Sequence, residues 1–207
     1  MNIIIESCCE SLEGVRRAVV GGCSRIELCE ALALGGVTPS GELISRALDV
    51  ASAAGVPVNV LVRPRGGNFV YSAGEEAAML SSIEFCKHLG VNGVVIGALT
   101  CDGDVDLPLM RRLIASARPL EVTFHRAVDR SRDMAAALED IISLRCERVL
   151  TSGHAPDAYS GRFVLGGLVR QARGRIIVMP GCGITPSNLA AIASSSGASE
   201  FHGTRLP

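Results

Sequence analysis

The sequence predicts a parallel α/β fold, a (β/α)₈ barrel of the TIM type formed by one domain over residues 1–207. Short apolar segments rich in Val and Ile alternate with longer segments of helical periodicity, an order typical of a parallel sheet covered by helices. Eight strand-like segments occur, and eight suit a closed barrel better than an open sheet. A doubly wound open sheet is the alternative, but no GxGxxG motif follows the first strand.

Strands are expected in the short apolar segments 2–8, 25–29, 57–63, 93–98, 120–125, 148–152, 175–180 and 199–203. The longer segments between them have apolar residues at helical spacing and predict helices at 11–21, 41–54, 74–89, 106–116, 133–144, 161–173 and 186–196. Three of these helices follow a residue that favours the N-cap position, namely Ser72, Asp106 and Thr185. The segment 93–98 (GVVIGA) is apolar throughout, which indicates a strand buried on both faces.

The eighth helix of a complete barrel has no counterpart in this sequence. Only four residues follow Gly203, which is too few for a helix of ordinary length. Either the chain is truncated, or another subunit covers the side of the barrel where the eighth helix would lie, and apolar surface is left uncovered between the last strand and the first helix. Because exposed apolar patches mark interaction sites, we expect the protein to form homo-oligomers.

Charge and hydropathy argue against nucleic-acid and membrane partners. Lys and Arg total 20 and Asp and Glu total 21, so no excess of positive charge attracts nucleic acid or an anionic membrane. No apolar stretch approaches the ~20 residues that span a bilayer. The N-terminus lacks the features of a signal peptide, since Glu6 interrupts its apolar run. The eight cysteines form no CxxC pair, so free thiols in the reducing cytoplasm are expected.

Polar residues gather toward the carboxyl ends of the predicted strands, which otherwise begin with apolar residues. Residues two apart share one face of a strand, which places Glu6 with Cys8 on the first strand and Glu27 with Cys29 on the second. Charges are rarely buried without a partner, because desolvation costs several kcal/mol. The strand ends therefore predict a polar pocket or a layer of ion pairs, in which the arginines that end the third strand neutralise both glutamates.

Three sets of residues at these strand ends are candidates for catalysis or ligand binding. Carboxylates and imidazoles are most readily tuned toward neutral pH, so the acid–base candidates are Glu6, Glu27 and His125. The guanidiniums of Arg63 and Arg65 suit bidentate binding of a carboxylate or phosphate, and an internal ion pair is their alternative role. The other ligand-binding candidates lie at the ends of the last three strands and are Thr151, Ser152, Gly153, Gly181, Gly183, Glu200 and His202.

The loop after the seventh strand has a composition that suits an anion. Gly181 and Gly183 expose backbone N–H groups, and a predicted helix begins directly after them at Thr185 and Pro186. In barrels the loops after strands seven and eight are the common phosphate site. In the alternative interpretation, the glycines serve only tight strand-to-helix turns.

Cys8 and Cys29 end the first two strands. Adjacent strands lie ~4.8 Å apart, so the two sulfur atoms can approach each other if strand order follows the sequence. Two thiolates at short separation suit a soft ion such as Cu(I), and His125 or His202 is available to complete the ligand set. Two ordinary buried cysteines are the alternative, because Cys also packs as a small hydrophobe.

Nine short segments along the chain form a specific set when they are taken together in order. They are 6–11 (ESCCES), 25–29 (RIELC), 35–40 (GGVTPS), 63–72 (RPRGGNFVYS), 97–103 (GALTCDG), 122–127 (VTFHRA), 150–153 (LTSG), 180–184 (PGCGI) and 200–202 (EFH). In these segments the chain resembles the copper homeostasis protein CutC family along its whole length. The resemblance implies a (β/α)₈ barrel, a cytoplasmic location, self-association and a role in copper handling, with Cu(I) bound by Cys8 and Cys29.

Two functions follow as hypotheses. In the first, the chain is a cytoplasmic copper homeostasis protein that binds Cu(I) through Cys8 and Cys29 at the carboxyl-terminal mouth of the barrel. In the second, it is a barrel enzyme that acts on a small anionic or phosphorylated metabolite through the Arg, Glu and His side chains of the strand ends. A copper ion or a small anionic ligand is thus the expected partner, and Cu(I) is the candidate cofactor.

Overall fold

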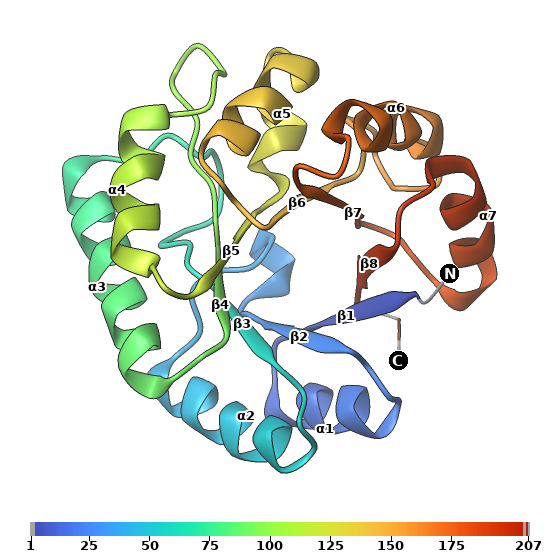
Figure 1. Cartoon of the computed structure of the whole chain (residues 1–207). Helices are drawn as coiled ribbons and strands as arrows, with labels where there is room; N and C mark the ends of the chain where they lie inside the picture. Colours follow the sequence, from blue (N-terminus) through green and yellow to red (C-terminus); the bar gives the residue numbers. More distant parts are fainter. Residues whose placement is uncertain (1–2, 205, 207) are drawn as a thin grey trace.

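The computed structural model describes residues 3–204 and 206, which form a barrel of parallel strands enclosed by helices (Figure 1). The strands are β1 (Ile4–Cys9), β2 (Arg25–Leu28), β3 (Val58–Leu61), β4 (Gly93–Ile96), β5 (Glu121–Phe124), β6 (Arg148–Thr151), β7 (Ile177–Pro180) and β8 (Glu200–Gly203). The α-helices are α1 (Leu12–Val20), α2 (Gly41–Ala53), α3 (Ala73–Leu89), α4 (Leu107–Ala117), α5 (Met134–Ser143), α6 (Arg162–Ala172) and α7 (Pro186–Ser196). Two 3₁₀ helices, η1 (Leu32–Leu34) and η2 (Arg126–Arg130), follow β2 and β5.

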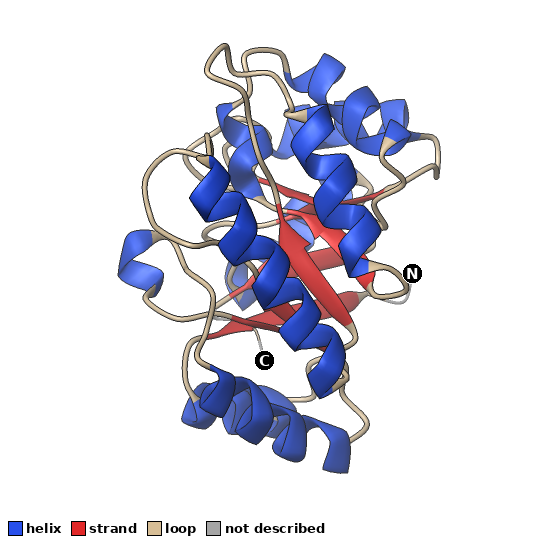
Figure 2. Cartoon of the chain, turned by 90° about the vertical axis from the view of Figure 1, so that its left-hand side faces the viewer, coloured by secondary structure: helices blue, strands red, loops and turns tan. Residues whose placement is uncertain are grey.

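The structure confirms every predicted strand and helix. The first strand begins at Ile4, and the predicted start at residue 2 lies outside the described residues. Hydrogen-bonded neighbours follow the sequence from β7 back to β1, and β8 pairs with β1. The two end strands of this order, β7 and β8, contact each other, so the sheet closes into a nearly complete barrel. Figure 2 shows the strands at the centre with helices outside them.

Successive strand residues face the helices and the barrel interior in turn. On the outer face, Ile26, Leu28 and Val60 belong to the large buried cluster between the sheet and the helices. The small separate cluster comprises Cys8, Cys29, Leu61 and Val95. Because residues two apart share a face, the interior also receives polar side chains, several of which are buried.

The predicted helix starts are capped by the predicted residues. The Ser72 hydroxyl accepts a hydrogen bond from the Glu75 N–H, and the Glu75 carboxylate accepts one from the Ser72 N–H, which forms a capping box. The Asp106 carboxylate accepts a hydrogen bond in the first turn of α4. Thr185 is the N-cap residue of α7. These caps satisfy N–H groups that the start of a helix leaves unpaired.

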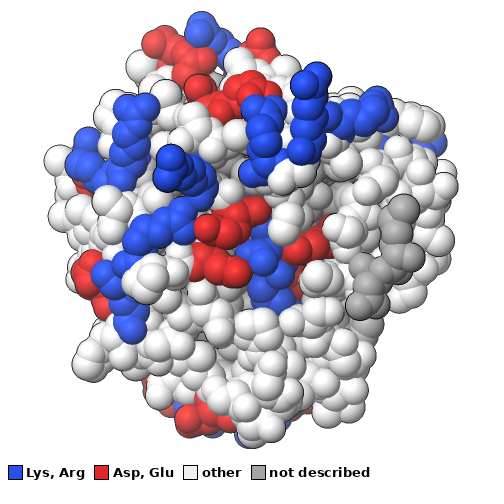
Figure 3. All heavy atoms as spheres, viewed as in Figure 1, with Lys and Arg blue, Asp and Glu red and all other residues white. Residues whose placement is uncertain are grey.

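Between α7 and α1 the barrel has no helical cover among the described residues, as expected from the short segment after β8. Figure 1 shows both chain ends in this region, beside β8 and β1. On the face drawn in Figure 3, acidic and basic side chains lie interleaved near the centre of the barrel. None of the described helices is both long enough and apolar enough to cross a membrane.

Candidate functional site at the carboxyl ends of the strands

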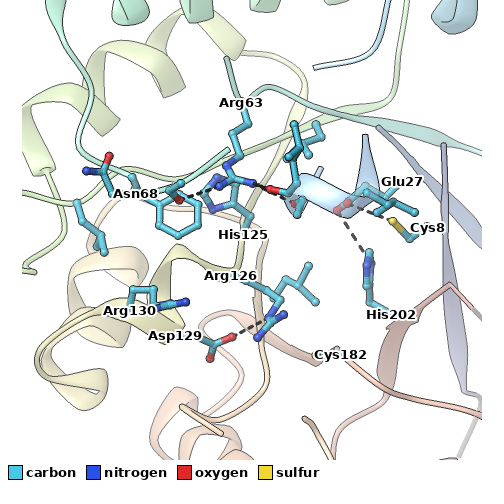
Figure 4. A pocket seen from close by; sticks show the side chains of 18 of the residues that line it. Cys8, Glu27, Arg63, Asn68, His125, Arg126, Asp129, Arg130, Cys182 and His202 are labelled. Atoms are coloured by element: carbon cyan, nitrogen blue, oxygen red, sulfur yellow. Dashed lines mark hydrogen bonds and ion pairs between the residues drawn. The ribbon is translucent and has the colours of Figure 1, made fainter. Parts of the chain in front are cut away.

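A cavity of about 860 Å³ opens at the carboxyl ends of the strands (Figure 4). All eight strands contribute to it through their last residues or the loops that follow. Its polar and sulfur-containing lining includes Cys8, Glu27, Arg63, Asn68, His125, Arg126, Asp129, Arg130, Cys182 and His202. Its apolar walls include Leu32, Leu61, Phe69, Leu99 and Leu150. The end of the barrel that the sequence predicts as the working end therefore holds a cavity of ligand size.

A layer of ion pairs lies in the barrel interior on the amino-terminal side of this cavity. Arg25 pairs with Glu6 and, through Nη2 at 2.7 Å, with Glu200 Oε2. Arg148 donates to the same Glu200 oxygen from Nε at 2.9 Å and to Glu121 Oε2 from Nη1 at 2.7 Å. All of these residues except Glu121 are buried. Mutual pairing is what allows these charges to stay inside the barrel, because an unpaired buried charge is strongly destabilising.

This layer corrects the sequence analysis in two respects. The expectation that every strand begins apolar is wrong, since β2, β6 and β8 begin with Arg25, Arg148 and Glu200. Glu6 is neutralised by Arg25, which lies directly opposite it in the β1–β2 register, and not by the arginines that follow β3. Glu6 and Glu200 are therefore in the ion-pair layer and are not among the residues that line the cavity.

His202 joins the ion-pair layer to the cavity, because its Nδ1 lies 2.8 Å from Glu6 Oε1 and 4.0 Å from Glu27 Oε2. Burial by itself would raise the pKa of Glu6, but the hydrogen bond and charge of His202, with those of Arg25, lower it to about 2. Burial raises the pKa of Glu27 to about 7, against the opposing charge of His202. Burial would lower the pKa of His202, but the charges of Glu27 and Glu6 raise it. Two carboxylates on neighbouring strands thus differ in proton affinity because only one is fully paired.

Cys8 and Cys29 lie beside each other, as the order of the first two strands predicts. Their Sγ atoms are 3.8 Å apart, and Cys8 Sγ is also 3.8 Å from Glu27 Oε1. The hydrogen bond with Cys29, burial and the charge of Glu27 all raise the pKa of the Cys8 thiol. Cys8, Glu27 and His202 each offer one ligand atom, and these three atoms lie within 4.8 Å of one another. His202 is thus the imidazole beside the thiols, and His125 is not part of this group.

Arg63 and Arg65 do not present two free guanidiniums at the cavity. Arg63 donates from Nη1 to the Gly36 carbonyl at 2.9 Å and from Nη2 to the Gly67 carbonyl at 2.9 Å. Arg65 pairs with Glu75 and donates to carbonyls of its own loop, and it is not among the residues that line the cavity. Both side chains hold the loop between β3 and α3 in shape, and Arg63 is the one that reaches the cavity.

The Asp129 carboxylate, on η2, is bound by residues at the end of β6 and in the loop after it. Its Oδ1 accepts hydrogen bonds from Thr151 Oγ1 at 2.6 Å, from the Ser152 N–H at 3.1 Å and from the His154 N–H at 3.2 Å. The Gly153 N–H donates to Thr151 Oγ1 at 2.9 Å. The groups that the sequence analysis assigns to ligand binding therefore hold an internal carboxylate. Sequence reasoning missed Asp129 because these partners are at least 22 residues away and no local pattern marks it.

The loop after β7 contributes to the cavity through Cys182 and Gly183, which have φ values of 80° and 70°. Gly181 serves close packing, because a Cβ atom there would lie 2.5 Å from Leu150 Cδ1. The Gly181 N–H donates to the Thr151 carbonyl at 2.9 Å and is already satisfied. Of the two glycines predicted to bind an anion, only Gly183 lines the cavity.

His125 follows β5 and packs against Phe69, with ring centroids 5.0 Å apart. Its Nδ1 accepts a hydrogen bond from the Ala127 N–H at 3.2 Å. Burial and the charge of Arg63 lower the pKa of His125 to about 3. The imidazole is therefore neutral at neutral pH, a state suited to hydrogen bonding more than to proton exchange near pH 7.

Comparisons with known proteins agree with this geometry. The CutC family model matches residues 3–206. A CutC family protein from Parabacteroides distasonis is 50% identical over 98% of this chain and 82% of its own length. One from Aliivibrio fischeri is 44% identical over 98% of this chain and 81% of its own length.

Solved structures show the same relationship. The crystal structure of the "Putative Copper Homeostasis Protein CutC" from Streptococcus agalactiae has a TM-score of 0.95 and 32% identity, and the match covers 99% of this chain and 100% of that one. Deoxyribose phosphate aldolase from Aeropyrum pernix has a TM-score of 0.72 and 15% identity over 98% and 86%, which shows a common fold alone. The family match spans nearly every described residue, and the chain therefore belongs to the CutC family.

Proposed function

We propose that the protein binds Cu(I) through Cys8 and Cys29 and takes part in copper homeostasis in the cytoplasm. The observation that carries the proposal is the pair of buried sulfur atoms 3.8 Å apart, one of which lines the cavity. Soft thiolate ligands select Cu(I) over hard cations. The family of the chain, and the name of its structural neighbour from S. agalactiae, support the same role.

The separation of the two sulfur atoms favours a bent arrangement about the ion. With zinc–sulfur bonds of ~2.3 Å as a guide, two sulfurs on one ion lie ~3.8 Å apart at a tetrahedral angle and ~4.6 Å apart in a line. The 3.8 Å between Cys8 and Cys29 matches the bent case. An ion held in this way has room for further ligands, and Glu27 and His202 are the nearest candidates.

The surroundings of the thiols also favour a soft ion over a hydrated one. Cys29 is fully buried and Cys8 is 9% exposed, and Leu61, Val95 and Leu32 pack around them. Because the pKa of the Cys8 thiol is raised, the thiol holds its proton until a metal displaces it. Copper binding therefore releases protons and strengthens as the pH rises.

Competition with a coloured Cu(I) chelator under anaerobic conditions tests this proposal. The Cys8→Ser/Cys29→Ser double variant is expected to lose the tight site, because oxygen ligands suit Cu(I) poorly. A Cys101→Ser/Cys182→Ser double variant is the matched control, since both of these cysteines line the same cavity, on the loops after β4 and β7. Full affinity in the first variant, or equal loss in both, would remove the assignment of the site to Cys8 and Cys29.

The cytoplasmic location and self-association remain part of the proposal. All eight cysteines are free in the structure, which suits a reducing compartment. Light scattering of the purified protein tests the self-association, and a mass of one chain at all concentrations would contradict it.

A further inference from the structure

Three side chains of different chemistry meet at the cavity, where β1, β2 and β8 present Cys8, Glu27 and His202. Each offers one ligand atom to an ion, and the three atoms lie within 4.8 Å of one another. Among the described residues, this is the one group of three or more Cys, His, Asp or Glu side chains gathered so closely. Figure 4 shows them together on one side of the cavity.

The Glu27 carboxylate faces both other members of this group. Its Oε1 lies 3.8 Å from Cys8 Sγ, and its Oε2 lies 4.0 Å from His202 Nδ1, which is too far for a hydrogen bond. Oε2 is buried and has no hydrogen-bond partner among the described residues. Because most buried polar atoms in proteins are paired, this oxygen indicates a partner that lies among the three side chains and not in the open cavity.

The distances within the group are close to those around a tetrahedral ion. With bonds of ~2.3 Å to sulfur and ~2.0–2.2 Å to oxygen and nitrogen, the ligand atoms of such an ion lie ~3.4–3.6 Å apart. The observed separations of 3.8 Å and 4.0 Å are slightly longer. No separation in the group exceeds 4.8 Å, so side-chain movements of about 1 Å suffice to enclose an ion.

The charge of the group favours a divalent ion over Cu(I). When a metal is bound, Cys8 is a thiolate, Glu27 is a carboxylate and His202 is neutral, so the three ligands carry two negative charges. A divalent ion makes this buried group neutral, whereas Cu(I) leaves a negative charge on it. An uncompensated buried charge is costly, and Arg25 is already engaged with Glu6.

The mixture of ligand atoms narrows the choice further. Mg²⁺ and Ca²⁺ take oxygen ligands, and Cu(I) prefers thiolates, whereas Zn²⁺ accepts sulfur, nitrogen and oxygen in one site. Glu6 Oε1 lies 2.8 Å from His202 Nδ1. Zinc-binding histidines are commonly oriented by a carboxylate in this way, and a ring whose Nδ1–H is bonded to a carboxylate keeps the lone pair of Nε2 for the ion.

We propose that Cys8, Glu27 and His202 bind Zn²⁺, with water from the cavity in the fourth position. Cys29 lies outside this group, since it is fully buried, does not line the cavity and contacts the Cys9 carbonyl at 3.7 Å. The zinc site shares Cys8 with the thiol pair, so Zn²⁺ and Cu(I) exclude each other. It does not otherwise rest on copper binding.

Competition with a zinc chelator tests the site, with Zn²⁺ alone as the probe and the reduced protein kept under anaerobic conditions. We expect one ion per chain with a Kd below about 1 μM. Glu27→Gln keeps the size of the side chain and is expected to weaken binding at least about tenfold. The Cys101→Ser/Cys182→Ser variant is the control and should bind as wild type does. A Kd above about 1 μM for the wild type, or equal affinity in Glu27→Gln, would overturn the proposal.

Co²⁺ in place of Zn²⁺ gives a readout that a structural role alone would not move, because thiolate-bound tetrahedral Co²⁺ absorbs strongly in the visible and near-ultraviolet. We expect these bands in the wild type and in Cys29→Ser, their absence in Cys8→Ser, and a shift in His202→Gln. Loss of the bands in Cys29→Ser, or an unchanged spectrum in His202→Gln, would contradict the proposed ligands. If Glu27→Gln does not fold, as judged by circular dichroism of the metal-free protein, His202→Gln takes its place in the chelator experiment.

Titration of Cu(I) into the same variants separates this site from the copper pair. We expect Glu27→Gln to keep its Cu(I) affinity and Cys29→Ser to lose it, which is the reverse of the result for Zn²⁺. Unchanged Cu(I) affinity in Cys29→Ser would remove the copper pair and leave the zinc site standing. Loss of both ions in Cys29→Ser would overturn the zinc site and leave the copper pair standing.

Discussion

Replacing Glu6 by Gln removes the negative charge from a fully buried position between Arg25 and His202. The loss of stability follows from the environment of the carboxylate. A folded-state pKa of about 2, against an ordinary value of 4.5, corresponds to about 3 kcal/mol of stability at pH 7. The stabilisation depends on pH in the direction expected for a carboxylate whose pKa is lower in the folded state than in the unfolded chain. The stabilisation is fully present above about pH 4.5 and is lost as the pH falls toward 2.

Urea denaturation of wild type and Glu6→Gln at pH 7 and pH 3 measures this effect. We expect the difference in unfolding free energy to be about 3 kcal/mol at pH 7 and about half as large at pH 3. Glu13→Gln is the control, because Glu13 is a 65% exposed partner of Arg17 on α1 and its removal should cost less than about 0.5 kcal/mol. A difference for Glu6→Gln that is below about 1 kcal/mol, or that does not change between the two pH values, would contradict a stabilising role for the Glu6 charge.

Three further substitutions, with Gly74→Ala as a control, test packing and hydrogen bonding by denaturation midpoints. Gly97→Ala is expected to lower the free energy of unfolding by about 1–3 kcal/mol, because the Cβ of the new alanine would lie 2.5 Å from His125 Nδ1. Gly74→Ala, with no atom within 4 Å of the new Cβ, is expected to be neutral, and equal effects would contradict the packing argument. Asp129→Ala is expected to lower the free energy of unfolding by about 3 kcal/mol, since the loop after β6 loses its shared acceptor. Amide hydrogen exchange is then expected to become faster in that loop alone. Unchanged exchange would contradict this explanation. Ser72→Ala is expected to lower the free energy of unfolding by about 1 kcal/mol, because the capping box of α3 is lost. An unchanged denaturation midpoint would contradict this expectation.

The pairing of Cys8 with Cys29 was predictable for a simple physical reason. Parallel strands joined by helical crossovers in sequence order become neighbours, so residues at equivalent strand ends meet. The same rule brings Glu27 beside Cys8 and places both in the polar mouth. The cap at Ser72 was predictable because its partner Glu75 lies three residues away.

The ion-pair layer was not predictable from these rules, although a signal was present. Arg25 stands two residues before Glu27 and so shares its face, which shows that a charge points inward at the start of β2. Its partner Glu200 is 175 residues away, and they meet only because β8 closes the ring against β1. Neither the spacing of residues along the chain nor the composition predicts which arginine pairs with a given glutamate.

The sequence was enough to predict the succession of strands and helices, the parallel order and the end of the barrel where thiol, carboxylate and imidazole groups collect. These follow from periodicity and chain connectivity, which act between neighbours along the chain. Other features depend on the tertiary structure: Arg63 is held by backbone carbonyls, Asp129 on η2 accepts hydrogen bonds from the loop after β6, and His125 Nε2 has no partner among the described residues. Such contacts join side chains from distant strands, and their geometry is set when closure of the barrel fixes all eight strand ends around one cavity.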